Sequence, residues 1–299
     1  MTSPPTHIWY DGELVNTDAS GCSLLEHGLH YGTGVFEGIR CYETEAGPAV
    51  FRLDDHLARL EAGAHVLDMT IDREELARAT CAVLGANKHR SAYIRPIVFY
   101  GAGSLGLDVG EALVRHTAVA SLPWTSHLGE AAESKGVLLK TSTVRRVPAD
   151  SVPPLKLCGT YVNSILAKLE ATRAGYEEAL FVDPDGRVCE ATGENVFLVR
   201  DGRVIAVSHP DALPGITRQT IIELTGADER PVFLDELLEA DEVFLTGTSA
   251  EVAPVSLIDD VSLPLGPVTR RLQQQYQDLV HGRLPGFGRW LTPVEPWTV

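Results

Sequence analysis

Lysine is scarce in this chain, and one lysine has surroundings suited to covalent chemistry. The 299 residues contain five lysines, Lys88, Lys135, Lys140, Lys156 and Lys168. Four of them fit polar loops, an exposed strand position or the solvated face of a helix, whereas Lys156 lies between apolar neighbours in Val-Pro-Pro-Leu-Lys-Leu-Cys-Gly. Apolar surroundings disfavour the ammonium form, which lowers the pKa of the amine and makes it a nucleophile. On this spacing alone, an ordinary lysine ahead of a helix stays an open alternative.

Three further segments offer the charges and dipoles that a phosphorylated cofactor needs. Cys189–Asn195 places the carboxylates of Glu190 and Glu194 in a glycine-containing turn. Leu213–Arg218 runs into a helix whose first N–H groups can bind a phosphate, and Leu245–Glu251 is a second small-residue loop that could bind another anion. Each segment alone is more often an ordinary turn. Together with a lysine nucleophile they predict pyridoxal phosphate as the cofactor.

A glycine-rich segment offers a competing interpretation. Gly101, Gly103 and Gly106 follow a strand with the spacing of a dinucleotide-binding fingerprint. However, that strand contains Pro96, and no acid for a ribose follows some twenty residues later. A glycine-rich surface loop is therefore the preferred interpretation. An NAD-dependent dehydrogenase and a non-catalytic small-molecule-binding protein remain the alternatives from other functional classes.

Composition indicates which binding partners and which cellular compartment to expect. Lys plus Arg is 25 and Asp plus Glu is 41, so the formal net charge is −16, which predicts no nucleic-acid partner and no anionic membrane surface. No apolar run approaches the roughly 18 residues of a membrane helix, and the first residues lack a secretory signal pattern. The five cysteines form no CxxC pair and the histidines form no HExxH motif. We therefore expect no metal site, no disulfide framework and a cytoplasmic location.

Hydrophobic periodicity and turn residues predict the elements that position these segments. Hairpins are expected around Asp11-Gly12 and Asp201-Gly202. The predicted helices open at Asp54-Asp55 or lie within Arg73–Leu84, Tyr161–Arg173, Arg218–Leu224 and Val268–Val280. The predicted strands are Ser91–Tyr100, Thr117–Trp124, Gly136–Val144 and Ala179–Asp183. Pro96 predicts an edge strand or a bulge for the first of these strands.

The alternation of these elements predicts an α+β fold. A length of 299 residues suggests two domains at about 150 residues each. We expect a small N-terminal α/β domain in residues 1–122, an interdomain loop in 123–134, and a larger domain with mixed sheets in 135–299.

Five motifs, in this order and spacing, resemble the branched-chain amino acid aminotransferases, which are pyridoxal phosphate enzymes of fold type IV. They are His30-Tyr31-Gly-Thr-Gly-Val-Phe36-Glu37-Gly38-Ile-Arg40, Lys156 with Tyr161 five residues on, Glu190–Asn195, Leu213–Arg218 and Gly247–Glu251. The similarity runs from Ile8 to about Leu279. The later motifs are typical of the fold type, and the first motif favours the branched-chain group.

The resemblance implies roles toward the cofactor in its pyridoxal and pyridoxamine forms. Lys156 would bind the cofactor covalently and later move a proton between the substrate α-carbon and the cofactor. Glu190 would pair with the pyridine nitrogen, and Tyr161 would hydrogen-bond the ring hydroxyl. The groups that would bind the phosphate are Arg59, the Ile216 and Thr217 amides, and Thr248.

The resemblance also implies a substrate pocket for L-leucine, L-isoleucine and L-valine, with 2-oxoglutarate as acceptor and branched-chain 2-oxo acids and L-glutamate as products. The residues that would wall it are Tyr31, Phe36, Gly38, Tyr93 and Trp124, with Leu107 supplied by a partner subunit. The Ser249 and Ala250 amides would bind the α-carboxylate. Arg40 and Arg95 would meet the γ-carboxylate of glutamate. One departure is His127, which stands where a pocket tyrosine is common and leaves the side-chain preference open.

Related enzymes of the same fold type remain alternatives. D-amino acid transaminases, (R)-amine transaminases and aminodeoxychorismate lyase share Lys156, Glu190 and the phosphate loops. Phe36–Gly38 together with Arg40 and Arg95 favours L-branched-chain substrates. The resemblance further implies a homodimer or larger homo-oligomer with the active site at the subunit interface. The sequence does not decide whether the protein is a dimer or a hexamer, or whether its role is in amino-acid biosynthesis or breakdown.

Overall fold

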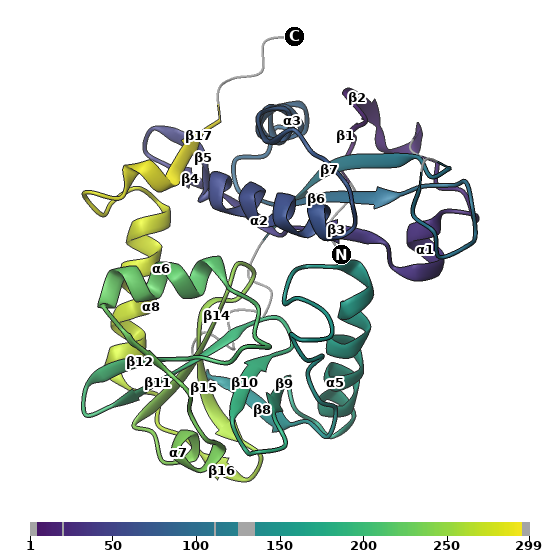
Figure 1. The fold of residues 1–299 in the computed structure, drawn as a ribbon. Helices are drawn as coiled ribbons and strands as arrows, with labels where there is room; N and C mark the ends of the chain where they lie inside the picture. Colours follow the sequence, from purple (N-terminus) through teal and green to yellow (C-terminus); the bar gives the residue numbers. More distant parts are fainter. Residues whose placement is uncertain (1–4, 20, 111, 125–134, 295–299) are drawn as a thin grey trace. The chain divides into compact units, whose positions relative to one another are not determined.

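The structure, a computed structural model, describes residues 5–19, 21–110, 112–124 and 135–294 (Figure 1). Contacts divide the chain into two compact units. The first comprises the described residues of Met1–Thr125, Leu155–Thr160 and Asp278–Val299, and the second those of Ser126–Pro154 and Tyr161–Gln277. The sequence division at 123–134 assigned the segment around Lys156 to the second domain, whereas the contacts of Leu155–Thr160 are made with the first unit.

The first unit is built on an antiparallel sheet with the strand order β17-β5-β4-β6-β7-β1-β2, and β3 pairs with β6. Its strands are β1 (His7–Tyr10), β2 (Glu13–Asn16), β3 (Gly34–Phe36), β4 (Ile39–Thr44), β5 (Gly47–Phe51), β6 (Ala92–Tyr100), β7 (Arg115–Pro123) and β17 (Leu291–Pro293). The predicted hairpin at Asp11-Gly12 is confirmed, since β1 pairs with β2 and both turn residues have positive φ, 44° and 103°.

The prediction that Pro96 marks an edge strand or a bulge is wrong, because β6 is an inner strand and its register with β7 is unbroken. Pro96 pairs in register with Val119 of β7, and β3 and β4 follow one another along the opposite side of β6. The Glu37 N–H donates to the Pro96 carbonyl at 3.0 Å, so Pro96 faces the interruption between β3 and β4. The missing proline N–H falls where the neighbouring ladder is already broken, and an inner strand therefore tolerates it.

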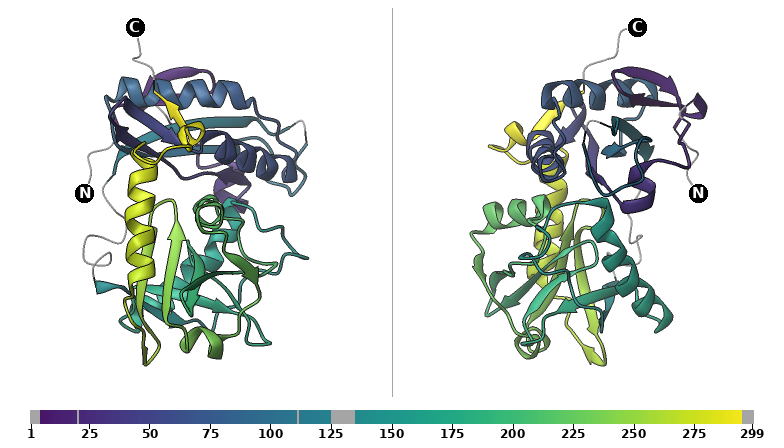
Figure 2. Two further views of the ribbon diagram at one scale, coloured as in Figure 1. Left: turned by 90° about the vertical axis from the view of Figure 1, so that its left-hand side faces the viewer. Right: turned by 45° about the vertical axis from the view of Figure 1, so that its right-hand side comes forward.

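Two long helices pack against this sheet, as Figures 1 and 2 show. The helices of the first unit are α1 (His27–Tyr31), α2 (Leu53–Val66) and α3 (Arg73–Ala86), with short 3-10 turns η1 (Thr17–Ala19), η2 (Cys158–Thr160) and η3 (Gly288–Trp290). α2 buries Leu57 and Leu60, as the periodicity predicted. Asp72 caps α3 by accepting hydrogen bonds from two first-turn N–H groups.

The second unit is built on a mixed sheet with the strand order β10-β9-β8-β15-β14-β11-β12-β13, and β16 pairs with β15. Its strands are β8 (Val137–Thr141), β9 (Glu178–Val182), β10 (Val188–Ala191), β11 (Asn195–Arg200), β12 (Arg203–Val207), β13 (Asp228–Arg230), β14 (Glu242–Gly247), β15 (Glu251–Ile258) and β16 (Val261–Ser262). β8 runs parallel to β9 and β15, and β12 runs parallel to β13. The Asp201-Gly202 hairpin is confirmed by the pairing of β11 with β12.

Helices α5 (Tyr161–Arg173), α6 (Ile216–Thr225), α7 (Leu234–Leu238) and α8 (Pro267–Val280) complete the described elements. α5 has the predicted bounds and lies beside β9, as Figures 1 and 2 show. Its small residues Ala167 and Ala171 are buried in a cluster with Phe181 of β9. Within the described ranges, no helix is long and apolar enough to cross a membrane.

Candidate active site

Lys156 is held on strand β3 of the first unit. The Phe36 N–H donates to the Lys156 carbonyl at 3.1 Å, and Val35 forms an isolated bridge with Leu157. Gly159 N–H donates to the Gly32 carbonyl at 3.1 Å, which fixes the other end of the segment. The half-buried Lys156 side chain places its Nζ 5.2 Å from the centroid of the Phe36 ring. The predicted nucleophile therefore lies against a predicted pocket residue.

Arg59, predicted to bind the phosphate, is gripped by a buried acid to which the sequence analysis assigned no role. Its Nε donates to Glu37 Oε1 at 2.6 Å, and its Nη2 donates to Glu37 Oε2 at 3.0 Å. His56 Nδ1 lies 2.8 Å from Glu37 Oε2. Burial by itself raises the pKa of Glu37, but Arg59 and His56 outweigh it and hold that pKa far below its usual range. Glu37 is thus a carboxylate that fixes the direction of the Arg59 guanidinium.

His56 completes this cluster as a neutral ring. Burial is the main cause that lowers the pKa of His56, and the charges of Arg59 and Lys156 add to it, although Glu37 acts in the opposite direction. The cluster therefore combines one carboxylate with one guanidinium at neutral pH. The signal available from the sequence was the helical spacing of His56 and Arg59, which places both side chains on nearly the same face of α2.

Four predicted pocket residues share one face of the first sheet. Arg40 lies directly opposite Tyr93 in the β4–β6 ladder, and Phe36 lies opposite Ile97 in the β3–β6 ladder. Alternate residues of β6 face the same side, so Arg95 joins them. The Arg95 guanidinium carbon lies 4.6 Å from the centroid of the Phe36 ring and 5.1 Å from that of Tyr93, and its Nη2 donates to Tyr93 Oη at 3.0 Å. The sheet register has gathered an aromatic wall and two guanidinium groups.

Gly38 and Trp124 belong to the same wall. A Cβ atom on Gly38 would lie 1.9 Å from Tyr93 Oη, so the tyrosine occupies the space that any larger residue would need. The Trp124 ring contacts the Tyr93 ring with 4.8 Å between centroids. The sequence thus predicted a set of residues that does come together on this sheet.

Tyr31, Leu107 and His127 are placed differently. Tyr31 is 44% exposed and its hydroxyl donates to the Leu105 carbonyl at 2.7 Å. Leu107 is 79% exposed, in the loop between β6 and β7. His127 and most of the predicted interdomain loop lie outside the described residues.

In the second unit, Glu190 on β10 accepts hydrogen bonds from side-chain and backbone donors. Arg146 Nε donates to Oε1 at 2.7 Å, while the Leu213 N–H and Asn195 Nδ2 donate to Oε2 at 2.9 and 3.3 Å. Arg146 was missed by the sequence reasoning, because nothing in its own segment indicates a partner 44 positions away. These donors orient the Glu190 carboxylate, as a group that pairs with a pyridinium must be oriented.

The two predicted anion sites lie at a helix start and in a turn. Gly215 is the N-cap of α6 and supplies no side-chain cap to the first N–H groups of the helix, which include those of Ile216 and Thr217. The turn after β14 holds Thr248 and Ser249, both half-buried, and the buried Ala250. Backbone N–H groups at a helix start suit a phosphate.

The half-buried Tyr161 opens α5. Its predicted contact with the cofactor ring stays a prediction, as do the roles of the other site residues toward bound molecules. Across the described part of the chain, no group of three or more His, Cys, Asp or Glu residues is arranged to hold a metal ion.

A second acidic cluster lies close to Glu190. Glu178 and Glu194 are both buried, and Glu178 accepts hydrogen bonds from Lys168 Nζ at 2.7 Å and from the Thr192 hydroxyl at 2.6 Å. Glu194 accepts one long bond, from the Gly193 N–H at 3.3 Å. Burial, followed by the charge of Glu178, raises the pKa of Glu194 to about 8. Burial and the neighbouring carboxylate therefore favour the protonated form of Glu194.

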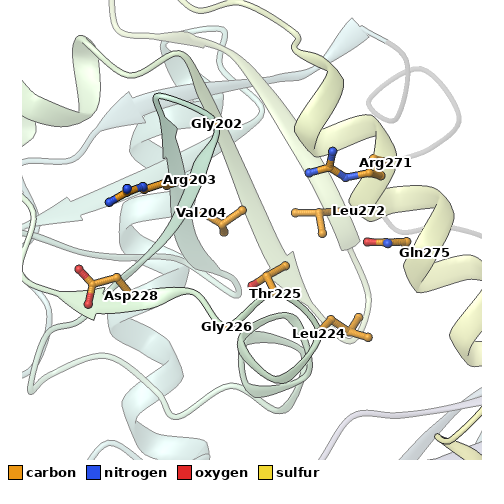
Figure 3. Close-up of a pocket in the computed structure, with 10 residues that line it drawn as sticks. All are labelled: Gly202, Arg203, Val204, Leu224, Thr225, Gly226, Asp228, Arg271, Leu272 and Gln275. Atoms are coloured by element: carbon orange, nitrogen blue, oxygen red, sulfur yellow. The ribbon is translucent and has the colours of Figure 1, made fainter.

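A groove in the second unit does not coincide with the predicted site. Its volume is about 640 Å³, and it lies between β12, the end of α6, and α8 (Figure 3). Val204, Leu224 and Leu272 form its apolar part, with Arg203 and Arg271 on opposite sides. None of the site residues predicted from the sequence lines it.

The glycine-rich segment of the competing interpretation forms no dinucleotide site. Gly101–Gly106 follows β6, and the residues described between it and β7 form no helix. A Cβ on Gly103 would lie 2.2 Å from the Ala112 carbonyl oxygen, so close packing accounts for that glycine. The structure therefore contradicts the dehydrogenase alternative in the form the sequence suggested.

Comparison with known proteins assigns the family. The model of the class IV amino-transferases matches residues 34–258. The chain belongs to the class IV aminotransferases. It is 42% identical to a branched-chain-amino-acid aminotransferase of Pseudomonas aeruginosa, over 96% of this chain and 97% of that protein. The resemblance stated from the motifs is thereby confirmed, and the chain is an aminotransferase.

Solved structures agree with this class IV assignment. The T.th. branched-chain amino acid aminotransferase complexed with N-(5'-phosphopyridoxyl)-L-glutamate has a TM-score of 0.92 and 43% identity, covering 99% of this chain and 100% of that one. A structure of the same T.th. enzyme with pyridoxamine 5'-phosphate has a TM-score of 0.93 and 44% identity, with the same coverage. The predicted α+β fold of type IV, with mixed sheets, is confirmed.

Proposed function

We propose that this aminotransferase uses pyridoxal phosphate to transfer the amino group between L-branched-chain amino acids and 2-oxoglutarate. The observation that carries the substrate assignment is the shared sheet face of Phe36, Tyr93, Arg40 and Arg95. An aromatic wall accommodates an aliphatic side chain, whereas a guanidinium meets the γ-carboxylate of glutamate. One pocket that accepts both substrates needs both features.

The residues of this chain fit the cofactor by their chemistry. Lys156 supplies an amine, Glu190 supplies a carboxylate oriented by Arg146, and the start of α6 supplies N–H groups without a side-chain cap. When bound, the cofactor supplies an electron sink that stabilises negative charge at the substrate α-carbon. The two solved relatives with phosphopyridoxyl and pyridoxamine phosphate groups support this assignment.

The proposal gives each site residue a defined role. Lys156 binds the cofactor and carries the proton that leaves the substrate α-carbon, and Glu190 holds a proton on the pyridine nitrogen. Tyr161 hydrogen-bonds the ring hydroxyl. The phosphate is bound by Arg59, the Ile216 and Thr217 amides, and Thr248. The Ser249 and Ala250 amides orient the substrate through its α-carboxylate.

The direct test is to trap the link to Lys156 and to measure transfer. The purified protein should be yellow, lose its visible band on borohydride reduction, and yield a Lys156 peptide carrying the phosphopyridoxyl mass. Lys156→Ala should lose transamination and the trapped peptide, while Lys168→Ala retains the trapped peptide at Lys156.

A substrate panel with 2-oxoglutarate as acceptor tests the specificity. We expect L-leucine, L-isoleucine and L-valine to react faster than D-amino acids or (R)-amines. A colourless protein, or a faster reaction with D-amino acids, would contradict the proposal.

The dual pocket is tested by Arg95→Ala. A charge-assisted hydrogen bond contributes roughly 1.5–3 kcal/mol, or about ten- to a hundredfold in kcat/KM. The half-reaction with L-glutamate should fall by that factor, while the half-reaction with L-leucine changes severalfold at most. Stopped-flow absorbance with each amino acid alone measures both half-reactions.

Arg90→Ala, which removes an exposed partner of Glu43 in the same unit, serves as control and should change neither half-reaction. Equal losses of rate with L-glutamate and L-leucine would mean that Arg95 supports the aromatic wall and does not bind the γ-carboxylate.

The exposed apolar face of α5 supports a homo-oligomer. Val162, Ile165, Leu166 and Leu169 recur at helical spacing and are 58, 55, 52 and 43% exposed. The buried side of the same helix carries small residues, so the polarity expected of a surface helix is reversed. We propose that a second copy of the chain covers this face and that the exposed Leu107 enters the partner's pocket. Ile165→Lys should shift sedimentation toward monomer, whereas Val261→Lys should not.

A further inference from the structure

Glu190 is joined to the start of α6 by a closed ring of hydrogen bonds. The Leu213 N–H donates to Glu190 Oε2 at 2.9 Å. Asn195 Nδ2 donates to the Leu213 carbonyl at 2.9 Å and to the same Glu190 oxygen at 3.3 Å. Three side-chain and backbone groups from β10, β11 and the turn before α6 are therefore tied together.

The other end of the Asn195 amide touches Gly215, the N-cap of α6. A Cβ on Gly215 would lie 2.0 Å from Asn195 Oδ1 and 3.2 Å from its side-chain carbonyl carbon, so no side chain larger than hydrogen fits there. Gly215 has a φ of −71°, which any residue adopts, so its backbone conformation does not require glycine. The closest contact is the one with Asn195, and a Cβ would also lie 3.3 Å from the Arg218 Cβ. Asn195 itself is 5% exposed and is fixed in register opposite Thr246.

The chemistry of the ring requires an amide at position 195. Both partners of Nδ2 are acceptors, a carboxylate and a carbonyl, so the side chain between them must be a donor. Aspartate has the same shape but no donor when ionised, and it would place a second negative charge against Glu190. The ring therefore depends on both the length and the hydrogen-bonding character of asparagine.

We propose that Asn195 is a positioning residue that sets the separation between Glu190 and the first turn of α6, so that both ends of one phosphorylated pyridine are bound at once. The inference rests on the proposed function, in which Glu190 pairs with the pyridine nitrogen and the Ile216 and Thr217 amides bind the phosphate. A substitution at position 195 leaves Glu190 and the two amides in the chain and changes only how they are held.

The test compares pyridoxal phosphate with pyridoxal, which lacks the phosphate. Cofactor-depleted full-length protein is titrated with each compound, and binding is followed by visible absorbance. Asn195→Ala should weaken pyridoxal phosphate about tenfold or more, and should weaken pyridoxal less, because only the phosphorylated compound needs both ends aligned. The Kd of pyridoxal divided by the Kd of pyridoxal phosphate should therefore fall. Asn195→Asp should lower this Kd ratio further as the pH rises.

A double-mutant cycle checks that the contact with Gly215 acts through Asn195. Made in the parent protein, Gly215→Ala should weaken pyridoxal phosphate binding as Asn195→Ala does, because the alanine methyl group displaces the Asn195 amide. In the Asn195→Ala background the same substitution should cost little, because the clash is gone. Asn87→Ala is the control, since Asn87 is an asparagine of the first unit with several hydrogen bonds. It should lower Tm and leave the Kd ratio unchanged.

The outcomes separate the two proposals. If the parent protein binds no pyridoxal phosphate, or binds it no better than pyridoxal, the proposed function fails. If the parent shows the phosphate advantage, but Asn195→Ala and Gly215→Ala only lower Tm as Asn87→Ala does, the role of Asn195 is wrong. Additive losses in the double variant would likewise overturn it.

Discussion

Each unit of the protein contains a deeply buried glutamate within a motif of the predicted site, and the two differ in charge. Glu37 in the first unit is a carboxylate whose pKa lies far below its usual range, because Arg59 and His56 outweigh the effect of burial. Glu194 in the second unit has a pKa raised to about 8 by burial and by the charge of Glu178. Both residues stand beside a glycine in the chain.

The difference shows that partners, more than burial, decide the state of a buried acid. Glu37 accepts two bonds from a guanidinium and contacts an imidazole. Glu194 accepts one long N–H bond, and the nearby Lys168 is bonded to Glu178. Desolvation penalises the charged form of both, and only Glu37 has enough opposite charge and hydrogen bonding to offset it.

The largest expected effect is that of Arg59→Met, which should make Glu37 behave like Glu194. Breaking a buried ion pair leaves an uncompensated charge and costs about 3–5 kcal/mol of unfolding free energy. The pKa of Glu37 should then rise, because burial acts unopposed by the guanidinium. The loss should therefore be largest near pH 8 and smaller near pH 5. Urea unfolding without added cofactor, at both pH values, measures it.

Arg73→Met is the matched control for this substitution. Arg73 pairs with Glu61 at 3.4 Å, but both side chains are about half exposed. Exposed pairs contribute roughly 0–1 kcal/mol, so little change is expected at either pH. Equal losses for the two variants would show that burial of the Glu37 pair has no special weight.

Glu194→Gln should have an intermediate effect that depends on pH. The folded-state pKa of Glu194, about 8, lies above the ordinary 4.5, so the folded protein binds the extra proton between these values. This contribution is complete below about pH 4.5 and is lost as the pH rises toward 8. Glutamine lacks the proton equilibrium, so the variant should gain stability relative to the parent as the pH rises across that window. A constant difference from pH 5 to pH 8 would mean that Glu194 is ionised throughout.

The smallest effect is expected for Glu178→Gln. The substitution removes a like charge beside Glu194 and leaves Lys168 without its carboxylate partner, and both changes lower the pKa of Glu194. The loss of stability begins near pH 4.5 in both proteins, and in this variant it should end at a lower pH. Unfolding curves at closely spaced pH values measure the shift, with Glu177→Gln, an exposed neighbour, as control. A shift in the opposite direction would contradict the coupling of the two acids.

Local elements followed directly from the sequence. The hairpins at Asp11-Gly12 and Asp201-Gly202, and the bounds of α5, were predicted because turn chemistry and hydrophobic periodicity act within a few residues. The candidate nucleophile and acid were found in the same way, from residue types in short segments. The prediction for Pro96 was wrong because an inner strand accepts a proline where the neighbouring strand is interrupted. No local sequence pattern reveals that interruption.

By itself, then, the sequence determined which residues are available for chemistry, and tertiary structure alone decided which of them meet. Arg146 reaches Glu190 across 44 positions, and Glu37 meets Arg59 across 22. Lys156 packs on β3, about 120 residues earlier in the chain, and thereby joins the first compact unit. The physical reason is that an ion pair or a backbone bridge depends on distance in space, which strand register and helix packing set. A motif specifies the side chain, and its partner is fixed only when the sheets have formed.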